Sequence, residues 1–223
     1  MNVNFEYAKT LAGEGAILLL LSLIPYIGWV LGIVGIVLLI KGMKELSYYY
    51  QDEKIYQNSL TGVKYYIVAL VAAAVAVVAM VIGVASATGF TFAGNFVFTT
   101  GFAVGLISLF AGLVVAFVFY VLAATHLKRT FNTLAEKSGE QSFATAGTLL
   151  WVGSILTIIG VGLILIFIAW IYTTIGFFSM KSRQYQQYTY QPNGNGVPPT
   201  QPLQGQLTNP SYSSSQPQPK EML

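Results

Sequence analysis

The sequence contains no cysteine and little charge, and both shortages restrict what the protein can be. Without cysteine there are no disulfides, thiolate metal ligands or cysteine nucleophiles. Only 9% of its 223 residues are charged, whereas about a quarter are charged in an ordinary soluble domain. The hydrophobic content of 55% and the mean hydropathy of +0.64 indicate a chain whose main solvent is lipid.

Charged residues are missing from three long stretches. No Asp, Glu, Lys or Arg occurs in residues 15–40, 65–124 or 141–180. Each stretch exceeds the roughly 20 apolar residues that cross a hydrocarbon core about 30 Å thick. The sequence therefore predicts an all-α fold, a polytopic transmembrane helical bundle of the cell membrane. Its four long apolar segments are expected at residues 11–40, 66–87, 101–124 and 143–180.

The first and last apolar segments contain residues that break helices. Proline removes a backbone hydrogen bond and clashes with the preceding turn. We expect breaks at Pro25 and Gly28 in the first segment and at Gly160 and Gly162 in the last. The first segment is then either one long kinked helix or two shorter helices that meet at residues 25–28.

A shift of 134 positions superimposes several small residues of the first segment on small residues of the last. This correspondence indicates an internal repeat, or it reflects the high glycine content of the chain. A repeat would place two similar broken segments around a central helical hairpin, as in many transporters. The superimposed pairs are Ala12 with Ala146, Gly13 with Gly147, Gly28 with Gly162, and Gly42 with Gly176.

Basic residues are unevenly distributed among the connecting stretches. Residues 41–64 and 125–146 carry Lys and Arg, whereas residues 88–100 carry neither. The positive-inside rule puts the first two stretches in the cytoplasm and the third outside. If the outer segments each cross once, Lys9 and Lys181 lie outside. If they re-enter or form hairpins, all basic residues lie on one side, and we favour this topology. The tyrosine-rich stretch 41–64 reads as an interfacial loop.

The most regular pattern in the spans is a stripe of small residues along one face of the third span. The second span carries a matching face. Small residues let membrane helices approach closely and gain van der Waals contact. We expect these faces to pack the two spans together within one chain, and a homodimer contact is the alternative. The predicted packing residues are Gly101, Gly105, Ser108, Gly112 and Ala116 in the third span and Ala76 and Gly83 in the second.

The polar residues form no recognisable catalytic, cofactor-binding or metal-binding pattern. Hydrolysis inside a membrane needs paired carboxylates, an H-E-x-x-H helix or a serine with its base, and the spans contain none of these. The sole histidine, His126, cannot form a metal site alone, so we interpret it as interfacial. Glu14 sits at a segment boundary beside Lys9, which favours an interfacial acid over a proton site. We expect no enzyme activity and, because the basic residues are dispersed, no nucleic-acid binding.

The composition changes abruptly after Met180. Residues 1–180 are the expected membrane-embedded domain, and residues 181–223 hold seven of the 8 prolines among Gln, Ser, Tyr and Asn. Such a segment buries too little apolar surface to fold, so we expect a disordered tail. It either keeps the protein soluble at its surface or presents Pro-rich pieces to a tail-binding protein.

Three motifs resemble an archaeal family of integral membrane proteins catalogued as domain of unknown function 996. They are Lys9-Thr-Leu-Ala-Gly13, Pro25-Tyr-Ile-Gly28, and Lys44-Glu-Leu-Ser47 followed by Tyr49-Tyr50 and Asp52. The resemblance covers roughly residues 7–180. It implies a multi-pass membrane protein and brings no activity, cofactor or catalytic residue.

These observations favour a non-enzymatic scaffold or accessory component of the membrane. Its expected partners are the lipid bilayer, another membrane protein or a second copy, and a protein that binds the tail. The alternative is a small transporter or channel built on the broken outer segments. Hydroxyl groups would then line a weakly polar path, unless they bond to carbonyls of their own helices. These hydroxyls belong to Thr99, Thr100, Ser108, Thr157, Thr173 and Thr174.

Overall fold

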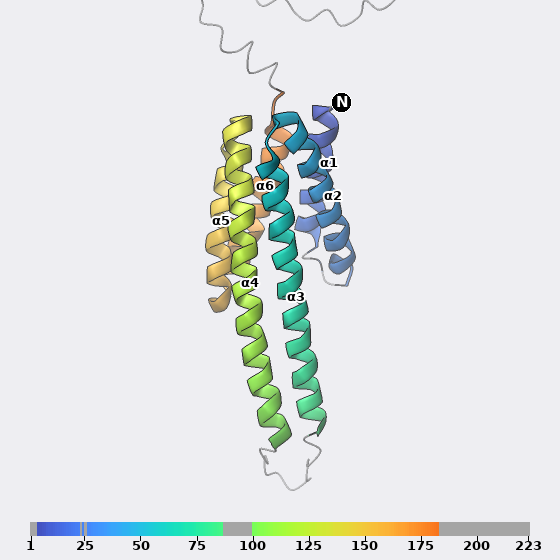
Figure 1. The fold of residues 1–223 in the computed structure, drawn as a ribbon, viewed down its shortest axis with the longest axis vertical. Coiled ribbons are helices and arrows are strands. Elements are labelled where there is room, and N and C mark those ends of the chain that lie inside the picture. Colours follow the sequence, from blue (N-terminus) through green and yellow to red (C-terminus); the bar gives the residue numbers. More distant parts are fainter. Residues whose placement is uncertain (1–3, 23, 25, 87–99, 183–223) are drawn as a thin grey trace, which may run out of the picture. The chain divides into compact units, whose positions relative to one another are not determined.

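The computed structural model describes residues 4–22, 24, 26–86 and 100–182, and every regular element in these ranges is helical (Figure 1). The all-α fold that the sequence predicts is therefore confirmed. Pro25 and the tail from residue 183 onward lie outside the described residues. The elements are α1 (Phe5–Leu21), α2 (Gly28–Tyr50), α3 (Glu53–Ser86), α4 (Thr100–Ser138), α5 (Ser142–Leu156), the short 3-10 helix η1 (Thr157–Ile159) and α6 (Gly162–Ser179).

The six α-helices form three antiparallel hairpins, α1–α2, α3–α4 and α5–α6, arranged as a ring. Each helix packs on its neighbours in the sequence, and α1 packs on α6 to close the ring. The start of α1, the α2–α3 and α4–α5 connections and the end of α6 all lie at one end of the ring (Figure 1). We call this the connected end. The outer segments therefore enter and return from the same end, as the hairpin topology expects.

The break in the first apolar segment separates two complete helices, so the two-helix interpretation is correct. Gly28 begins α2, and a Cβ atom there would overlap the carbonyl group of Ser22. In the last segment Gly160 closes η1 with a φ of 81°, a conformation that side chains rarely adopt. Gly162 begins α6 so close to the carbonyl group of Gly153 that a Cβ atom would overlap it. Glycine at these places permits the sharp reversals of both hairpins.

Gly28 and Gly162 occupy the same place in two hairpins. Both begin the second helix, and both lie against the backbone of the preceding turn. These are the glycines that the shift of 134 positions superimposes. Their equivalent roles favour an internal repeat over a chance match of glycines.

Two predicted loops are mostly helical in the structure. In residues 41–64, helix α2 continues to Tyr50 and α3 begins at Glu53; in residues 125–146, α4 continues to Ser138 and α5 begins at Ser142. The first stretch contains no proline that would prevent helix formation, and most of its charged side chains are exposed. A left-handed Gln51, with a φ of 53°, makes the α2–α3 turn. The prediction of an interfacial loop over residues 41–64 was therefore wrong, because only the short α2–α3 turn is not helical.

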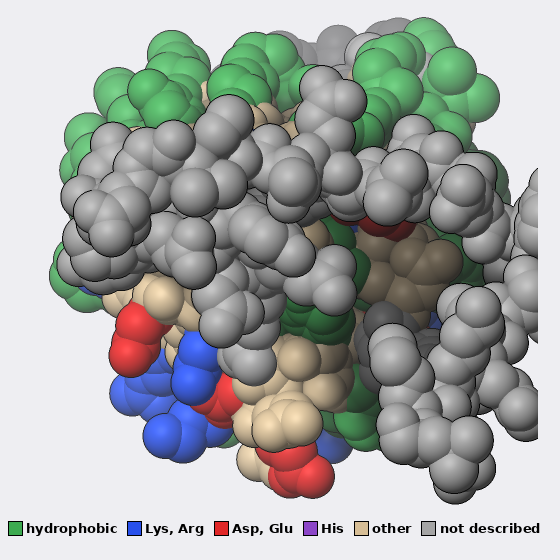
Figure 2. Space-filling view, turned by 90° about the horizontal axis from the view of Figure 1, so that it is seen from above, with side chains coloured by type: hydrophobic (Ala, Val, Ile, Leu, Met, Phe, Trp, Pro, Cys, Tyr) green, Lys and Arg blue, Asp and Glu red, His purple; other side chains and the backbone are tan. Residues whose placement is uncertain are grey.

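The hydrophobic core lies near the connected end of the ring. Phe131, Phe143 and Phe177 are fully buried there, and the ring centroids of Phe143 and Phe177 are 4.9 Å apart. Met43, Leu46, Ile55 and Leu134 belong to the same buried cluster. Seen from this end, charged side chains gather along one side of the molecule and hydrophobic ones along the opposite side (Figure 2).

Helices α3 and α4 continue well past the two outer hairpins (Figure 1). Within the described residues, four stretches are long and apolar enough to cross a membrane: Glu53–Ala85, Gly101–Ser138, Ser142–Ile159 and Gly162–Ser179. Valine, isoleucine and phenylalanine side chains on the outside of α3 and α4 are exposed, among them Val75, Ile82 and Phe110 at 62%, 62% and 66%. Such a surface suits a lipid environment.

Candidate functional site

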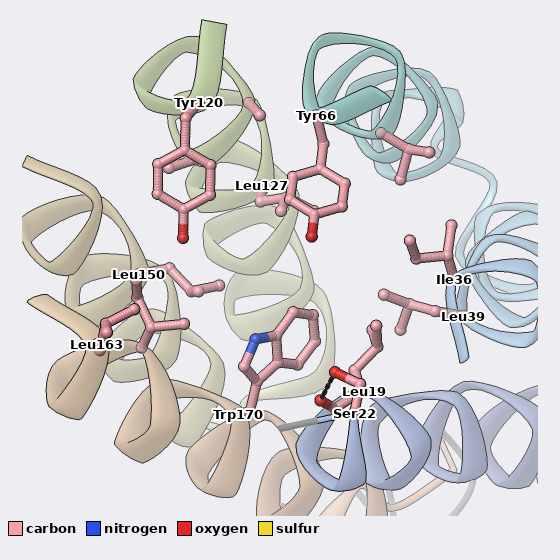
Figure 3. Close-up of a pocket in the computed structure, with 14 residues that line it drawn as sticks. Leu19, Ser22, Ile36, Leu39, Tyr66, Tyr120, Leu127, Leu150, Leu163 and Trp170 are labelled. Carbon is pink, nitrogen blue, oxygen red and sulfur yellow. Dashed lines mark hydrogen bonds between the residues drawn. The ribbon is translucent and has the colours of Figure 1, made fainter. Parts of the chain in front are cut away.

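A cavity of about 260 Å³ lies inside the ring, and all six α-helices contribute to its wall (Figure 3). Most of the wall is aliphatic. The apolar lining residues are Leu19 of α1, Ile36 and Leu39 of α2, Val63 of α3, Ala123, Ala124 and Leu127 of α4, Leu150 of α5, and Leu163 and Ile166 of α6. A mainly apolar pocket with a few polar groups is the usual form of a small-molecule site.

Three aromatic side chains with polar tips complete the wall. Tyr66 comes from α3, Tyr120 from α4 and Trp170 from α6. The rings of Tyr66 and Tyr120 lie side by side, with centroids 6.3 Å apart. Both hydroxyl groups point toward the space in front of the Trp170 indole (Figure 3). The cavity thus presents three N–H or O–H donors to one region.

The fourth polar group of the cavity is already engaged. The Ser22 hydroxyl donates a hydrogen bond of 2.6 Å to the Leu19 carbonyl group at the end of α1. None of the residues that line the cavity is charged. Within the described part of the chain, no group of three His, Asp or Glu side chains is placed to hold a metal ion. The site is therefore suited to an uncharged, mainly apolar molecule.

The cavity extends toward the tips of the two outer hairpins. Ser22 is the C-cap of α1, and Leu163 is the second residue of α6, so both lie beside a hairpin turn. The side chains around these turns are exposed and apolar: Ile24, Ile27, Trp29, Ile158, Ile159 and Leu163 are 44%, 58%, 71%, 74%, 66% and 57% exposed. This part of the cavity therefore lies beside an exposed apolar surface, which suits a lipid environment.

The predicted small-residue faces meet between α3 and α4. A Cβ atom on Gly83 would lie 2.7 Å from both the Gly101 carbonyl oxygen and the Gly105 Cα atom, and one on Gly112 would overlap the Ala76 side chain. Ala116 is buried on the same helix. Ser108 lies in a second hollow, a groove of about 400 Å³ on the protruding part of this pair. The groove is lined by Ala79, Ile82, Gly83, Gly101, Val104, Gly105 and Ser108.

The remaining predicted polar residues lie outside the cavity. The His126 Nδ1 atom is 3.3 Å from the Asn58 Oδ1 atom, and its ring packs beside that of Tyr65. The Glu14 side chain is exposed on α1. Thr157, Thr173 and Thr174 donate hydrogen bonds of 2.8, 2.8 and 2.9 Å to carbonyl groups of the preceding helical turn. These three hydroxyls therefore bond to their own helices, as one of the two interpretations expects, while the side chains of Thr99 and Thr100 lie outside the described residues.

Sequence reasoning identified the helix breaks but missed the cavity. Tyr66 reads as an interfacial tyrosine, and neither Tyr120 nor Trp170 belongs to any motif. A local pattern cannot show that three helices far apart in the sequence direct these groups into one space. One signal was available, since each is a polar-tipped aromatic within a charge-free stretch.

The amino-acid sequence matches a known protein family. The sequence profile of the family described as "Protein of unknown function (DUF996)" matches residues 31–171. The chain belongs to this family. Uncharacterized protein MJ1644 from Methanocaldococcus jannaschii is 26% identical over 182 residues, which cover 81% of this chain and 95% of that protein. The resemblance that the sequence motifs indicated is therefore confirmed. No solved structure matches the chain.

Proposed function

We propose that the protein is a multi-pass, non-enzymatic component of the cell membrane that serves as a scaffold or accessory subunit for another membrane protein. The main support for this proposal is that α3 and α4 extend beyond the other described helices (Figure 1). From Ile67 to Ser86, α3 continues for about 20 residues past the cavity, and α4 has about 20 residues between Thr100 and Phe119. At 1.5 Å per residue, each extension is about 30 Å long, the thickness of a hydrocarbon core.

In this proposal α3 and α4 cross the bilayer as a pair, and the ring lies at one membrane face. The outer hairpins are too short to accompany the pair. Helix α1 ends two residues after Leu19, and α2 begins eight residues before Ile36, or about 12 Å from the cavity wall. The pair therefore crosses most of the membrane without cover from the chain's other described helices (Figure 1).

The groove on the α3–α4 pair is the proposed contact with a partner. Gly83 and Gly105 are buried in the α3–α4 contact, whereas Gly101 and Ser108 are small and partly exposed, so a partner backbone can come close beside these two. Inside a bilayer, the backbone of a partner has to satisfy its own hydrogen bonds, which favours a transmembrane helix as the occupant. The proposed occupant is a helix of a different membrane protein, and a second copy of this chain is the competing outcome.

Two tryptophan substitutions on α4 test the groove. Val104 lines the groove and is 57% exposed, whereas Leu113 is 44% exposed and lies about two and a half turns further along α4, on the other side of the α3 contact. Val104→Trp is expected to release a stoichiometric membrane partner from the protein purified in mild detergent from its native membranes, while Leu113→Trp retains it. Equal retention by both variants argues against the groove, and a partner identified as the same chain supports the homo-oligomer instead.

A small transporter is the second candidate, and the cavity lined by all six α-helices is the observation that favours it. Both hairpin turns beside the cavity depend on glycine, including Gly160. Movement of a turn would open or close the part of the cavity beside it. Transport is supported if reconstituted vesicles with wild-type protein take up the solute and vesicles with the Gly160→Val variant take up less of it. Absence of flux in wild type for a panel of small neutral solutes counts against it.

A further inference from the structure

We propose that the central cavity binds a neutral, mainly apolar molecule that carries an oxygen acceptor, such as a ketone or quinone carbonyl, and that is dissolved in the membrane. This inference goes beyond the scaffold proposal and does not depend on it. The carrying observation is the arrangement of Tyr66, Tyr120 and Trp170 around one space in an otherwise aliphatic wall (Figure 3).

The donors in this space lack partners within the protein. In the described part of the chain, no hydrogen bond engages the Tyr66 hydroxyl, the Tyr120 hydroxyl or the Trp170 N–H group. These three side chains are only partly buried, and a ligand that displaced water from their donors without supplying an acceptor would lose those hydrogen bonds. An acceptor atom held between these groups would satisfy several of them at once. Since the indole N–H can only donate, the ligand must supply an acceptor there.

The absence of charge determines the class of ligand. An anion or a cation would lose its hydration on entering and would meet no counter-ion among the lining residues. Lys64 and Lys128 belong to α3 and α4 near the cavity but are not part of its lining. Lys128 instead lies over the Trp151 ring, with its Nζ atom 4.5 Å from the centroid. A neutral ligand avoids the cost of desolvating a charge.

The position of the cavity indicates how the ligand arrives. It extends to Ser22 and Leu163 at the two hairpin turns, where the surrounding side chains are apolar and exposed. A molecule in the lipid phase can enter there without crossing water. The volume of about 260 Å³ lies just below the range of drug-sized pockets, so the bound part is small. It corresponds to one or two rings or a short branched hydrocarbon.

Two compounds of nearly equal shape test the proposal. The probe 1-tetralone is a neutral bicyclic ketone, and tetralin is the same hydrocarbon without the carbonyl oxygen. The readout is the thermal unfolding midpoint of the full-length protein in detergent, measured against probe concentration. Each variant is compared with its own ligand-free midpoint, which removes differences in intrinsic stability. Ligand that binds only the folded state raises this midpoint.

Variants of the cavity separate hydrogen bonding from filling. For wild type, 1-tetralone is expected to raise the midpoint at lower concentration than tetralin. In the Tyr66→Phe and Tyr120→Phe double variant, the half-maximal concentration of 1-tetralone is expected to rise about five- to tenfold, while that of tetralin stays unchanged. Ala124→Leu fills the cavity and should abolish both shifts. If Ala124→Leu does not fold, Leu163→Trp is used in its place. Leu163 is exposed and lines the part of the cavity beside the hairpin turns, so a tryptophan there narrows that part of the cavity.

A lipid-facing control completes the design. Val118 is 50% exposed on α4 and is not part of the cavity wall, so Val118→Leu should respond like wild type. Equal midpoint shifts in wild type and in the filled variants mean that the probes act through the detergent, which overturns the proposal. Loss of the shift in the filled variants with no preference for the ketone overturns the hydrogen-bonding part. No shift with either probe in wild type overturns binding of this class.

Discussion

Two glycines of α2, Gly42 and Gly32, have very different surroundings. A Cβ atom on Gly42 would lie 2.5 Å from the Ala12 backbone nitrogen and 2.7 Å from its Cα atom. The corresponding atom on Gly32 would meet only the Ser22 side chain, at 3.3 Å. The first contact is with backbone, which cannot move unless the whole helix moves. Helices α1 and α2 therefore pack at a distance that only glycine permits at position 42.

We expect Gly42→Ala to destabilise the α1–α2 hairpin by about 1–3 kcal/mol, the usual cost of overpacking. Gly32→Ala is the matched control, since it adds the same methyl group on the same helix. It should leave stability unchanged or raise it slightly through better helix propensity. Thermal unfolding of both variants in the same detergent makes the comparison. Similar midpoints for the two variants would show that α1 and α2 do not pack as closely as described.

At the scale of elements, the α2–α3 connection is held to the far end of α4. The Asp52 carboxylate accepts a hydrogen bond of 3.0 Å from the Lys54 backbone N–H at the start of α3. A second oxygen of this carboxylate lies 3.4 Å from the Lys137 Nζ atom near the end of α4. Asp52 thus both caps α3 and links two connections at the same end of the ring. Its two roles can be separated by substitution.

Asp52→Asn keeps an oxygen for the cap but removes the ion pair, so we expect a loss of at most about 0.5 kcal/mol, because the Lys137 side chain is 35% exposed. Asp52→Ala removes both roles and should cost about 1 kcal/mol more, the usual worth of an N-cap. Thermal unfolding at low and high salt distinguishes the contributions, since salt weakens only the ion pair. An Asn variant as unstable as the Ala variant would assign the stabilisation to charge rather than to capping.

The same scale shows why sequence reasoning succeeded for some elements and failed for others. Charge-free stretches and glycines mark the apolar helices and the hairpin turns because lipid solvation and backbone strain are local properties. The sequence does not predict the ends of α2 and α4 because charged residues are typical of loops, although charge is also compatible with an exposed helix face. The cavity was missed because Tyr66, Tyr120 and Trp170 meet only through tertiary packing of α3, α4 and α6. The hydrophobic periodicity of a single helix does not show which side chains of other helices it will face.

At the scale of the whole molecule, ring closure explains how the outer segments can avoid full crossings. Each reverses at glycine and returns to the connected end, where the charged residues of α2, α3 and α4 also lie. The contact between α1 and α6 then joins the two outer hairpins to each other. These contacts cover the inner faces of the two hairpins, while the side chains at their turns remain exposed and apolar.

The lack of native cysteine makes the resulting topology directly testable. Asn4→Cys, Asn95→Cys, Lys137→Cys and Ser214→Cys are made singly and treated in intact cells with a membrane-impermeant thiol reagent. Asn4 and Lys137 lie at the connected end, whereas Asn95 and Ser214 lie outside the described residues. With hairpin outer segments and basic residues facing the cytoplasm, only position 95 should be labelled.

Labelling after the cells are permeabilised is the control, because all four cysteines should then react. If positions 4, 95 and 214 are labelled in intact cells while 137 is protected, the outer segments cross the membrane once each. The ring of hairpins would then not exist in the cell, since an odd number of crossings cannot return a segment to its own side. The proposed cavity would lose two of its three hairpins, so this measurement bears on the site as well as on the topology.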